Sequence, residues 1–375
     1  MKKNTLDLSG ARLPADALRP QADLPKTQYG QGLSCPIPLS DYPHVLLAHG
    51  GGGKLTHSLI QKMFASQFSN DLLNPLHDGA VFSLNGSRLA FSTDSYVINP
   101  IFFPGGTIGD LSVNGTVNDL AMCGARPLYL SAAFIIEEGM DMNDLWRVVV
   151  SMQAAARTAG VQLVTGDTKV VDRGKGDKIF INTSGLGVID KGIDIQPKRA
   201  KSGDSIILSG PIAVHGIAIM SVREGLEFET EMKSDTAALN GLVSDMLRAG
   251  EKIHVLRDPT RGGVASVLNE IAESANVGIA ITEDSIPVTD EVRGACEILG
   301  LDPLYVANEG KLLAFVSPES TEEVLAAMKA NPLGRDSVVI GSVVPDHPRM
   351  VIMRSRIGGS RVVDMLSGEQ LPRIC

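Results

Sequence analysis

A β-hairpin is predicted at residues 77–94, where the sequence reads HDGAVFSLNGSRLAFSTD. Two short apolar strands, 80–84 and 88–92, are joined by Asn85-Gly86, which is a strong signal for a tight turn between antiparallel strands. Asp78 precedes the first strand and Asp94 follows the second. Carboxylates at strand ends, unlike those on helix surfaces, are well placed to bind a cation.

Further acidic residues follow the same pattern. Asp119 lies in the helical pattern 113–121, and Asp167 lies in TGDTK (165–169), directly after the buried-looking strand 161–164. Asp258 follows another strand and precedes glycines at a helix start. Each aspartate alone is commoner as a cap or turn residue. Several carboxylates beside a triphosphate need a divalent ion between them, so the set predicts a site for Mg²⁺ and a nucleotide.

A run of glycines precedes the hairpin, in HVLLAHGGGGK (44–54). We expect a strand over 44–48, then the glycines, then a helix, an order in which backbone N–H groups contact phosphate. The segment is not a Walker loop, because Ala48 and Leu55 occupy the places of its first glycine and its Ser/Thr. A tight turn that needs bare backbone is an equally good interpretation. His49 fits a phosphate donor less well than a turn residue.

The second half of the chain again alternates strands and helices. The basic segment 197–204 predicts a hinge into a second domain that opens with a strand over 205–209. Helices are expected near 239–247, 264–271 and 321–330, with strands over 312–316 and before the tail. The predicted parts are a flexible Pro-rich extension (1–43), a first domain (44–196), a second domain (197–363) and a mobile tail (364–375).

Composition excludes several classes of function. A chain of 375 residues is long enough for two domains. Its 34 basic and 43 acidic residues argue against a nucleic-acid partner. The 4 cysteines are scattered without zinc spacing, which is typical of a reducing cytoplasm. The sequence has no signal peptide and no run of roughly 20 apolar residues, so we expect no membrane partner.

The sequence ends in LPRIC, residues 371–375. A thiol at a chain end has no packing role that explains it, and from Asp364 a tail of about 11 residues extends at most ~36 Å. It can therefore reach a pocket in the body or a partner. An inert exposed thiol is the simple alternative. Because the rest of the chain shows no other obvious nucleophile for an ATP-using enzyme, Cys375 is the predicted reactive residue.

Together these motifs resemble the HypE family of hydrogenase maturation factors. The stretches that carry the resemblance are LAHG (47–50), 91–97 with FFPGG (102–106), 115–121, EEG (137–139), 165–171, INT (181–183), 258–263, 307–311 and LPRIC (371–375). The resemblance covers nearly everything from residue 47 to the end, and the ending is its most specific part. The Pro-rich extension lies outside it.

The resemblance implies an α+β, two-domain PurM-like fold, shared with aminoimidazole ribonucleotide synthetase and selenophosphate synthetase. Mixed and antiparallel sheets are flanked by helices in this fold, and the amino-terminal sheets pair across a homodimer. The implied activity is ATP-dependent dehydration of an S-carbamoyl group on Cys375 to a thiocyanate, with ATP and Mg²⁺ as cofactors. The implied partners are the carbamoyltransferase HypF and the HypC–HypD pair, which receives cyanide for the iron centre of nickel-iron hydrogenases.

The same resemblance assigns roles to individual residues. The positions that hold Mg²⁺ in the superfamily are matched by Asp78, Asp94, Asp119 and Asp258. The nucleotide site is matched by Asp94, Asn118, Gly166, Asp167 and Thr168. Glu309 is expected to be the catalytic base, and Lys169 to steady the oxygen or phosphate. A structural ion pair for Lys169 and a cap for Glu309 are the alternatives, and Glu270 is a weaker rival for the base.

Two other functions fit the motifs. One is a phosphotransferase that makes a free product, like selenophosphate synthetase or thiamine-phosphate kinase. Selenophosphate synthetase carries a reactive cysteine in its glycine-rich loop, whereas residues 50–53 here contain none and Cys35 lies too far upstream. The other is a carrier that presents a modified thiol without chemistry of its own. ATP turnover separates a carrier from a dehydratase.

Overall fold

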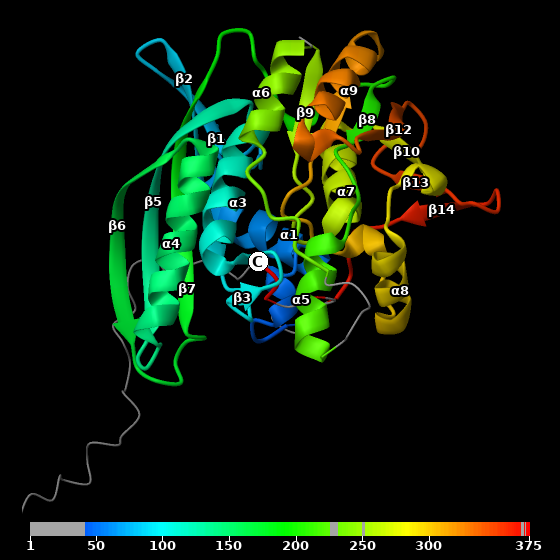
Figure 1. The fold of residues 1–375 in the computed structure, drawn as a ribbon. Helices are drawn as coiled ribbons and strands as arrows, with labels where there is room; N and C mark the ends of the chain where they lie inside the picture. Colours follow the sequence, from blue (N-terminus) through cyan, green and yellow to red (C-terminus); the bar gives the residue numbers. More distant parts are fainter. Residues whose placement is uncertain (1–41, 226–231, 250–251, 369–370, 372) are drawn as a thin grey trace, which may run out of the picture.

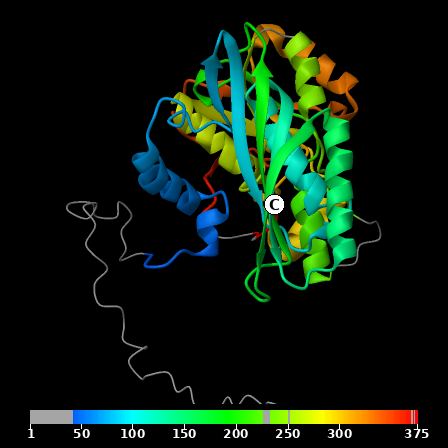
Figure 2. The same ribbon diagram turned by 90° about the vertical axis from the view of Figure 1, so that its left-hand side faces the viewer.

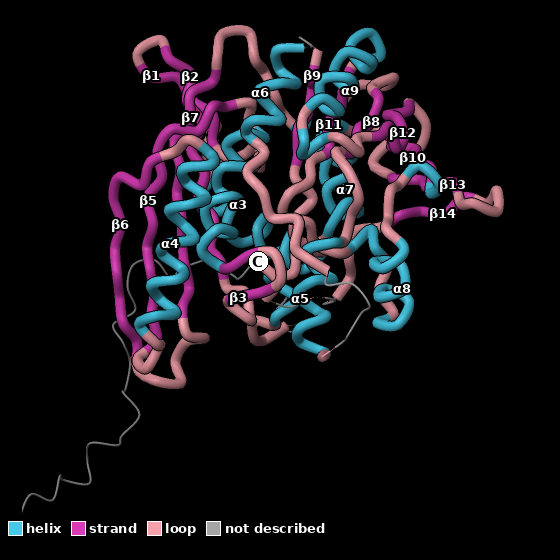
Figure 3. Tube along the Cα trace, viewed as in Figure 1, coloured by secondary structure: helices cyan, strands magenta, loops and turns pink. Residues whose placement is uncertain are grey.

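Two β-sheets form the framework of the computed structural model, which describes residues 42–225, 232–249, 252–368, 371 and 373–375 (Figures 1 and 3). Almost all of the expected extension 1–43 lies outside this description. The first sheet has the strand order β1-β2-β7-β5-β6. Its strands are β1 (Ala80–Leu84), β2 (Ser87–Tyr96), β5 (Ala125–Glu137), β6 (Gln162–Val171) and β7 (Ile179–Ile189). Only β5 and β6 run parallel, so the sheet is mixed.

The predicted hairpin is confirmed, and its second strand is longer than expected. β1 and β2 pair antiparallel around Asn85-Gly86, where both residues have positive φ. Because β2 continues to Tyr96, Asp94 lies inside the strand rather than after it. Inward side chains of β2 alternate with outward ones, and Asp94 shares the inward face with buried Ser92 and Tyr96.

Two helices, α3 (Ile108–Met122) and α4 (Met142–Ala159), cover the inner face of this sheet. α3 is buried on almost every side, as expected for a helix without a polar face. It packs on the first sheet and also contacts α6 and β9 of the second half. Thr107 caps its first turn by accepting hydrogen bonds from the N–H groups of Gly109 and Asp110. α3 therefore joins the two halves and carries Asn118 and Asp119 between them.

The outer face of the first sheet has no helix over it among the described residues, as Figure 2 shows. Three large side chains on this face, Phe91, Tyr129 and Ile135, are each 45 to 46% exposed. β6 forms one edge of the sheet and is exposed along its length. Of the strand expected to be buried over 161–164, Val161 is buried, whereas residues 162–164 are exposed in the edge strand β6. The segment 165–169 lies within β6 and not after it.

The second sheet has the order β14-β13-β10-β12-β8-β11-β9 and is covered on both faces. Its strands are β8 (Ser205–Leu208), β9 (Ile253–Arg257), β10 (Gly278–Thr282), β11 (Leu313–Val316), β12 (Val338–Val344), β13 (Val351–Arg354) and β14 (Ser360–Val363). Helices α5 (Val214–Glu224), α7 (Gly263–Ala275) and α8 (Asp290–Leu299) pack on one face, and α6 (Asn240–Ala249) and α9 (Thr321–Ala330) on the other. Ile206 and Ile207 enter opposite cores, which explains the continuous apolar run of β8.

The segment before the first sheet differs from the expected strand. Residues 47–50 form a 3-10 helix, η2 (Leu47–Gly50), instead of a strand. Val45 and Leu47 are exposed, and no strand pairs with this segment among the described residues. His49 Nδ1 accepts a hydrogen bond of 3.0 Å from the Leu46 N–H, which turns the chain. The expected helix follows as α1 (Lys54–Leu59), a π-helical turn η3 (Ile60–Ala65) and α2 (Ser66–Phe68).

Short elements connect these parts. A small two-stranded ribbon, β3 (Phe102–Phe103) and β4 (Gly106–Thr107), lies beside the C-terminus between the two halves (Figure 1). Five further 3-10 turns are η4 (Pro197–Arg199), η5 (Glu283–Ser285), η6 (Pro303–Tyr305), η7 (Pro318–Ser320) and η8 (Pro332–Gly334). No helix in the described part of the chain is long and apolar enough to cross a membrane.

Candidate active site

Three of the four aspartates predicted to hold a metal meet between the two sheets. Asp78 lies just before β1, Asp119 lies in the last turn of α3, and Asp258 follows β9. One carboxylate oxygen from each lies within 4.8 Å of the others. Ser92 on β2 orients the cluster by donating hydrogen bonds of 2.7 Å to Asp119 Oδ2 and to the Asp78 carbonyl. Residues far apart in sequence thus form one acidic cluster.

This acidic cluster is short of positive charge. Burial, together with Asp258, raises the pKa of Asp119 well above its ordinary value. Burial and the nearby Asp78 raise the pKa of Asp258 to about 8. Burial opposes ionisation of Asp78 as well, but Arg257, whose Nε lies 2.8 Å from Asp78 Oδ1, lowers the pKa of that carboxyl overall. Asp78 Oδ2 is buried without a hydrogen-bond partner. An oxygen-rich, buried and negatively charged site of this kind fits Mg²⁺.

The C-terminal thiol lies beside the predicted base. Cys375 is 7% exposed and Glu309 is 3% exposed, and the Glu309 carboxyl group is one of the neighbours that, after burial, raise the pKa of the thiol. Burial, and then the neighbouring carboxylates Asp258 and Asp94, raise the pKa of Glu309 well above its ordinary value. Burial also raises the pKa of Cys375, against the opposing effect of Arg261. Glu309 Oε1 has no hydrogen-bond partner, so the carboxyl group keeps capacity to accept a proton.

Arg261 is the positively charged residue near this thiol. No role was predicted for it from the sequence. It precedes α7, and its Nη2 lies 3.6 Å from Asp94 Oδ1. The Cys375 sulfur is the largest influence that raises the pKa of the Arg261 guanidinium, ahead of Asp94 and Glu309. The only signal in the sequence was its place in the stretch 257–263. Arg257 was missed in the same way.

The tail that carries Cys375 is docked in the core of the first half. Ile374 is 2% exposed and packs in the same cluster as Ile98, Phe103 and Ile108. Val97 N donates a hydrogen bond to an oxygen of the terminal carboxylate of Cys375 (3.2 Å), and Asn99 N donates to the Arg373 carbonyl (3.3 Å). Figure 1 places the C-terminus between the two halves of the chain. The mobility expected for residues 364–375 stays a prediction, and this structure shows a docked state.

Other predicted site residues do not join this group within one chain. Gly166, Asp167, Thr168 and Lys169 lie on the exposed strand β6. Through the ladders of β2, β7, β5 and β6, Asp94 aligns with Thr183, Ala132 and Gly166. Three strand spacings separate Asp94 from Gly166 by about 14 Å. Lys169 Nζ pairs with Asp167 Oδ2 at 2.7 Å, as in the structural alternative. The roles of these residues stay predictions.

Two further candidate residues, Asn118 and Glu270, already have partners within the protein. The Asn118 amide donates to the Ala237 carbonyl (3.0 Å) and accepts from the Leu239 N–H (2.7 Å), so it holds the chain before α6. Glu270 Oε2 pairs with Arg257 Nη2 at 2.8 Å. Since Arg257 also binds Asp78, Glu270 supports the acidic cluster and does not contact the thiol through any described interaction. Of the two glutamates, Glu309 is the one that lies beside the thiol, and its role as the base stays a prediction.

The glycine run packs closely on other backbone. A Cβ on Gly52, whose φ is +75°, would lie 2.5 Å from the Arg261 carbonyl oxygen. A Cβ on Gly53 would lie 2.3 Å from the Leu366 carbonyl oxygen, and Lys54 N donates to that oxygen at 2.8 Å. These contacts agree with the interpretation of the glycine run as a tight turn that needs bare backbone. They also connect the glycine run to Arg261 and to the start of the tail. His49 has the local partner expected of a turn histidine.

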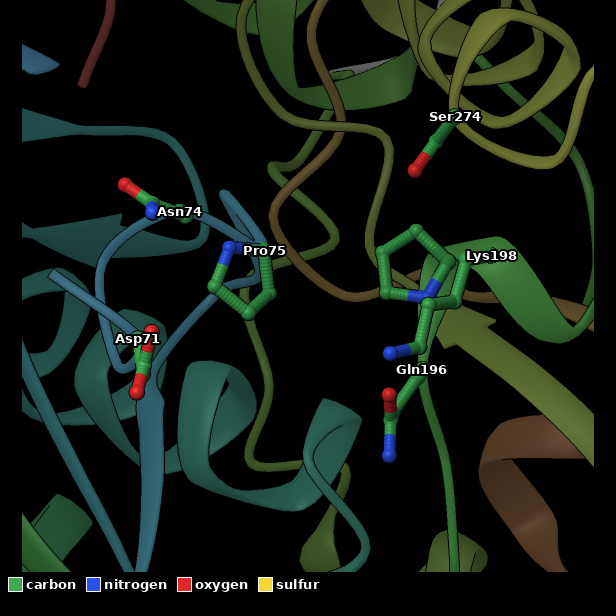
Figure 4. Close-up of a pocket in the computed structure, with 7 residues that line it drawn as sticks. Asp71, Asn74, Pro75, Gln196, Lys198 and Ser274 are labelled. Carbon is green, nitrogen blue, oxygen red and sulfur yellow. The ribbon is translucent and has the colours of Figure 1, made fainter. Parts of the chain in front are cut away.

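A separate pocket of about 370 Å³ lies between the segment after α2 and the start of the second half (Figure 4). Its lining includes Asp71, Pro75 and Lys198, and Figure 4 shows these side chains at its sides. None of the predicted site residues lines it. The chemistry suggested by the sequence therefore belongs to the acidic cluster and the docked thiol, not to this pocket.

Comparisons with known proteins agree with this geometry. Residues 76–189 match the model of the AIR synthase related protein, N-terminal domain, and residues 201–353 match that of the C-terminal domain. A carbamoyl dehydratase HypE from Rhizobium leguminosarum bv. viciae is 55% identical over 330 residues, which are 88% of this chain and 94% of that relative.

Solved structures give the same result. A crystal structure of HypE in complex with ATP is 50% identical, with a TM-score of 0.75 over 88% of this chain and 100% of that chain. A HypE–HypF complex contains a chain that is 48% identical, with a TM-score of 0.79 over 82% of this chain and 100% of that chain. The two-domain α+β fold implied by the resemblance is confirmed. The chain therefore belongs to the HypE family of carbamoyl dehydratases.

Proposed function

We infer that this chain is an ATP-dependent dehydratase that converts a carbamoyl group on its own Cys375 to a thiocyanate, in hydrogenase maturation. The observation that carries the inference is the burial of the Cys375 thiol against the Glu309 carboxyl group, beside Arg261. A substrate on the tail is delivered as part of the protein, so the reaction has the advantage of an intramolecular step. Curated relatives that are 54 to 55% identical carry the name carbamoyl dehydratase HypE.

The nucleotide is proposed to bind beside the acidic cluster. A HypE relative has been solved with ATP. In this chain Asp78, Asp119 and Asp258, with Asp94 near them, would hold Mg²⁺, which would neutralise the phosphate charge. The donors are all carboxylates, and the buried oxygen of Asp78 that lacks a partner is consistent with a cation ligand.

The chemistry requires one phosphoryl transfer and the loss of two protons. The carbamoyl oxygen attacks the γ-phosphorus of ATP, the bond to ADP breaks, and one N–H proton leaves. The second N–H proton then leaves as the C–O bond breaks, so the nitrogen lone pair completes the C≡N bond and phosphate departs. Glu309 is the proposed proton acceptor, and its raised pKa makes it a stronger base than an ordinary carboxylate.

Arg261 is proposed to do what the sequence analysis expected of Lys169. Its guanidinium lies beside the sulfur and Asp94, where it can stabilise negative charge on the carbamoyl oxygen and the transferred phosphoryl group. Lys169 lies on β6 with Asp167 as its partner. A role for Lys169 at the same site requires that β6 comes from a second copy of the chain.

We propose that the chain forms a homodimer through the first sheet. The apolar outer face with Phe91, Tyr129 and Ile135 is uncovered, and an exposed face of this kind marks an interaction site. The exposed strand β6, with Val164 58% and Val170 67% exposed, adds an unpaired edge. A dimer through this surface would bring Gly166–Lys169 of one copy toward its partner.

Partners are proposed from the relatives and from the tail. A HypE relative has been solved with HypF, so HypF is the proposed source of the carbamoyl group. The HypC–HypD pair is the proposed acceptor of the cyanide. A tail that meets such partners must leave the docked state, in which the thiol is buried. We place the reaction in the cytoplasm, where the free thiols of Cys123, Cys296 and Cys375 stay reduced.

The test is mass spectrometry of protein carbamoylated at Cys375. Addition of Mg·ATP should remove the mass of one water and form equimolar ADP and phosphate. Glu309→Gln should keep the carbamoyl mass, since the variant lacks the base. Glu270→Gln is the matched control and should still lose water. ATP binding with full retention of the carbamoyl mass in the parent protein would favour the carrier and refute the dehydratase.

A further inference from the structure

His215 connects the docked tail to the body of the protein. It lies near the start of α5, is fully buried, and has a partner at each ring nitrogen. Nε2 lies 2.8 Å from the Ile374 carbonyl oxygen, and Nδ1 lies 2.7 Å from Ser234 Oγ. Because a carbonyl only accepts, Nε2–H donates to Ile374 and Nδ1 accepts from the Ser234 hydroxyl. Burial lowers the pKa of His215, which favours this neutral ring.

The residue after Ser234 holds the loop of the base. Asp235 Oδ1 accepts a hydrogen bond of 3.1 Å from the Glu309 N–H, and Lys311 Nζ pairs with Asp235 Oδ2 at 3.3 Å. A Cβ on Gly310 would lie 1.8 Å from the Asp235 carbonyl oxygen, so the two backbones are in close contact. Ala237 N also donates to the Glu309 carbonyl at 3.3 Å. One short segment, 234–237, therefore contacts both His215 and the Glu309 loop.

We propose that His215, through Ser234 and Asp235, is a positioning residue that holds the tail in register with Glu309. The tail carries the reacting sulfur, and the 234–237 segment holds the loop that carries the proposed base, Glu309. The histidine binds the peptide carbonyl directly before Cys375, so it fixes the reacting sulfur without touching it. The catalytic consequence rests on the proposed function, but the docking itself does not.

Other contacts of the tail do not replace this link. The Val97 and Asn99 N–H groups and Arg223 bind backbone oxygens of the tail from its other neighbours. The two backbone N–H contacts join the tail to residues 97 and 99, and not to the loop of Glu309. Phe103 packs edge-on against the His215 ring at 5.6 Å between centroids and restricts its rotation. Ser234 and Phe103 therefore orient the ring through contacts that do not involve the tail.

A first experiment measures tail docking without catalysis. The rate at which iodoacetamide alkylates Cys375 is followed by peptide mass spectrometry, because the docked thiol is buried. In His215→Asn the amide reaches the place of Nδ1 but not that of Nε2, so alkylation should be about tenfold faster, the change expected for one lost hydrogen bond. In His215→Gln a donor reaches the tail again, and the rate should return to within about threefold of the parent.

The matched control is His254→Asn. His254 is also buried, but its Nδ1 pairs with Asp204 Oδ2 at 2.8 Å and it does not contact the tail. This control should leave Cys375 alkylation unchanged. Ser234→Ala, which does not disturb the packing of the ring, should accelerate alkylation less than His215→Asn does. It serves as the deciding variant if the asparagine variant does not fold.

A second experiment measures the reaction in one turnover. His215→Asn should slow Mg·ATP-dependent water loss from the carbamoylated tail at least tenfold, whereas His215→Gln should restore it. Equal alkylation rates in the parent, His215→Asn and His254→Asn would overturn the proposal, and so would a glutamine variant that behaves like the asparagine variant. A parent protein that loses no water would refute the proposed function, while the alkylation rates would still decide the role of His215.

Discussion

Replacing Asp258 with asparagine should make the metal-free protein more stable. Folding brings this carboxyl group next to Asp78 and Asp119, and its pKa rises from 3.8 to about 8. At pH 7 folding therefore requires Asp258 to take up a proton that the unfolded chain has released. The cost is about 1.4 kcal/mol for each of the roughly three pH units between 3.8 and 7, or about 4 kcal/mol. Asp258→Asn removes this cost and is expected to gain up to that amount.

The sign of the effect also predicts its dependence on pH. A raised carboxyl pKa destabilises the fold only above the unfolded value of 3.8, and the penalty grows until the pH reaches about 8. The advantage of the variant should thus shrink from about 4 kcal/mol at pH 7 to about 2 kcal/mol at pH 5. Urea unfolding followed by circular dichroism, in the presence of a chelator, measures both values.

Magnesium should stabilise the parent protein more than the Asp258→Asn variant. At a free Mg²⁺ concentration 100 times its dissociation constant, the parent should gain about 2.7 kcal/mol, whereas the variant should gain much less. Asp204→Asn is the matched control, because Asp204 is equally buried but pairs with His254 instead of other carboxylates. That control should lose stability at every pH. A variant at position 258 that is less stable than the parent in chelator at pH 7 would refute the electrostatic reasoning.

Three further predictions concern the glycine run, the sheet and the cation. Gly52→Ala should lower the free energy of unfolding by about 1–3 kcal/mol, because the φ of Gly52 is +75° and a Cβ would meet the Arg261 carbonyl. Gly50→Ala is the control: a Cβ there meets open space, so thermal unfolding should be unchanged. Ile135→Glu should convert the dimer to a monomer in analytical ultracentrifugation; an unchanged sedimentation coefficient would contradict the dimer proposal. Arg261→Met should slow water loss from carbamoylated Cys375 by about 10²–10³-fold in single-turnover mass spectrometry, the usual effect of removing one charge-stabilising group, and an unchanged rate would exclude Arg261 from the chemistry.

The local patterns that predicted secondary structure were mostly right. The turn at Asn85-Gly86 and the helices expected near 264–271 and 321–330 appear where the sequence pattern placed them. The strand expected over 44–48 does not form: residues 44–46 are irregular and a 3-10 helix begins at Leu47, and no described strand pairs with this segment. Pairing partners are a tertiary property, and a single sequence does not contain them in readable form.

The candidate site was likewise predicted only in part from the sequence. Aspartates at strand ends predicted an acidic cluster, and three of them meet in it. Arg261 was missed because a lone arginine in a turn carries no pattern, and only the folded chain shows that it faces the tail. The exposure of 162–164 was missed because an edge strand and a buried strand can share an apolar sequence. Such exposure follows from the order of strands in the sheet, which the sequence did not reveal.

The burial of the Cys375 thiol also has a consequence for damage in the cell. Peroxides and electrophiles attack thiolates, and reactive cysteines are usually exposed groups with a lowered pKa. Here burial, and then the neighbouring Glu309, raise the pKa of the thiol. While the tail is docked, the sulfur is therefore inert toward oxidants. Docking therefore protects the Cys375 thiol between successive modifications. Oxidation of this thiol should occur only while the tail is undocked.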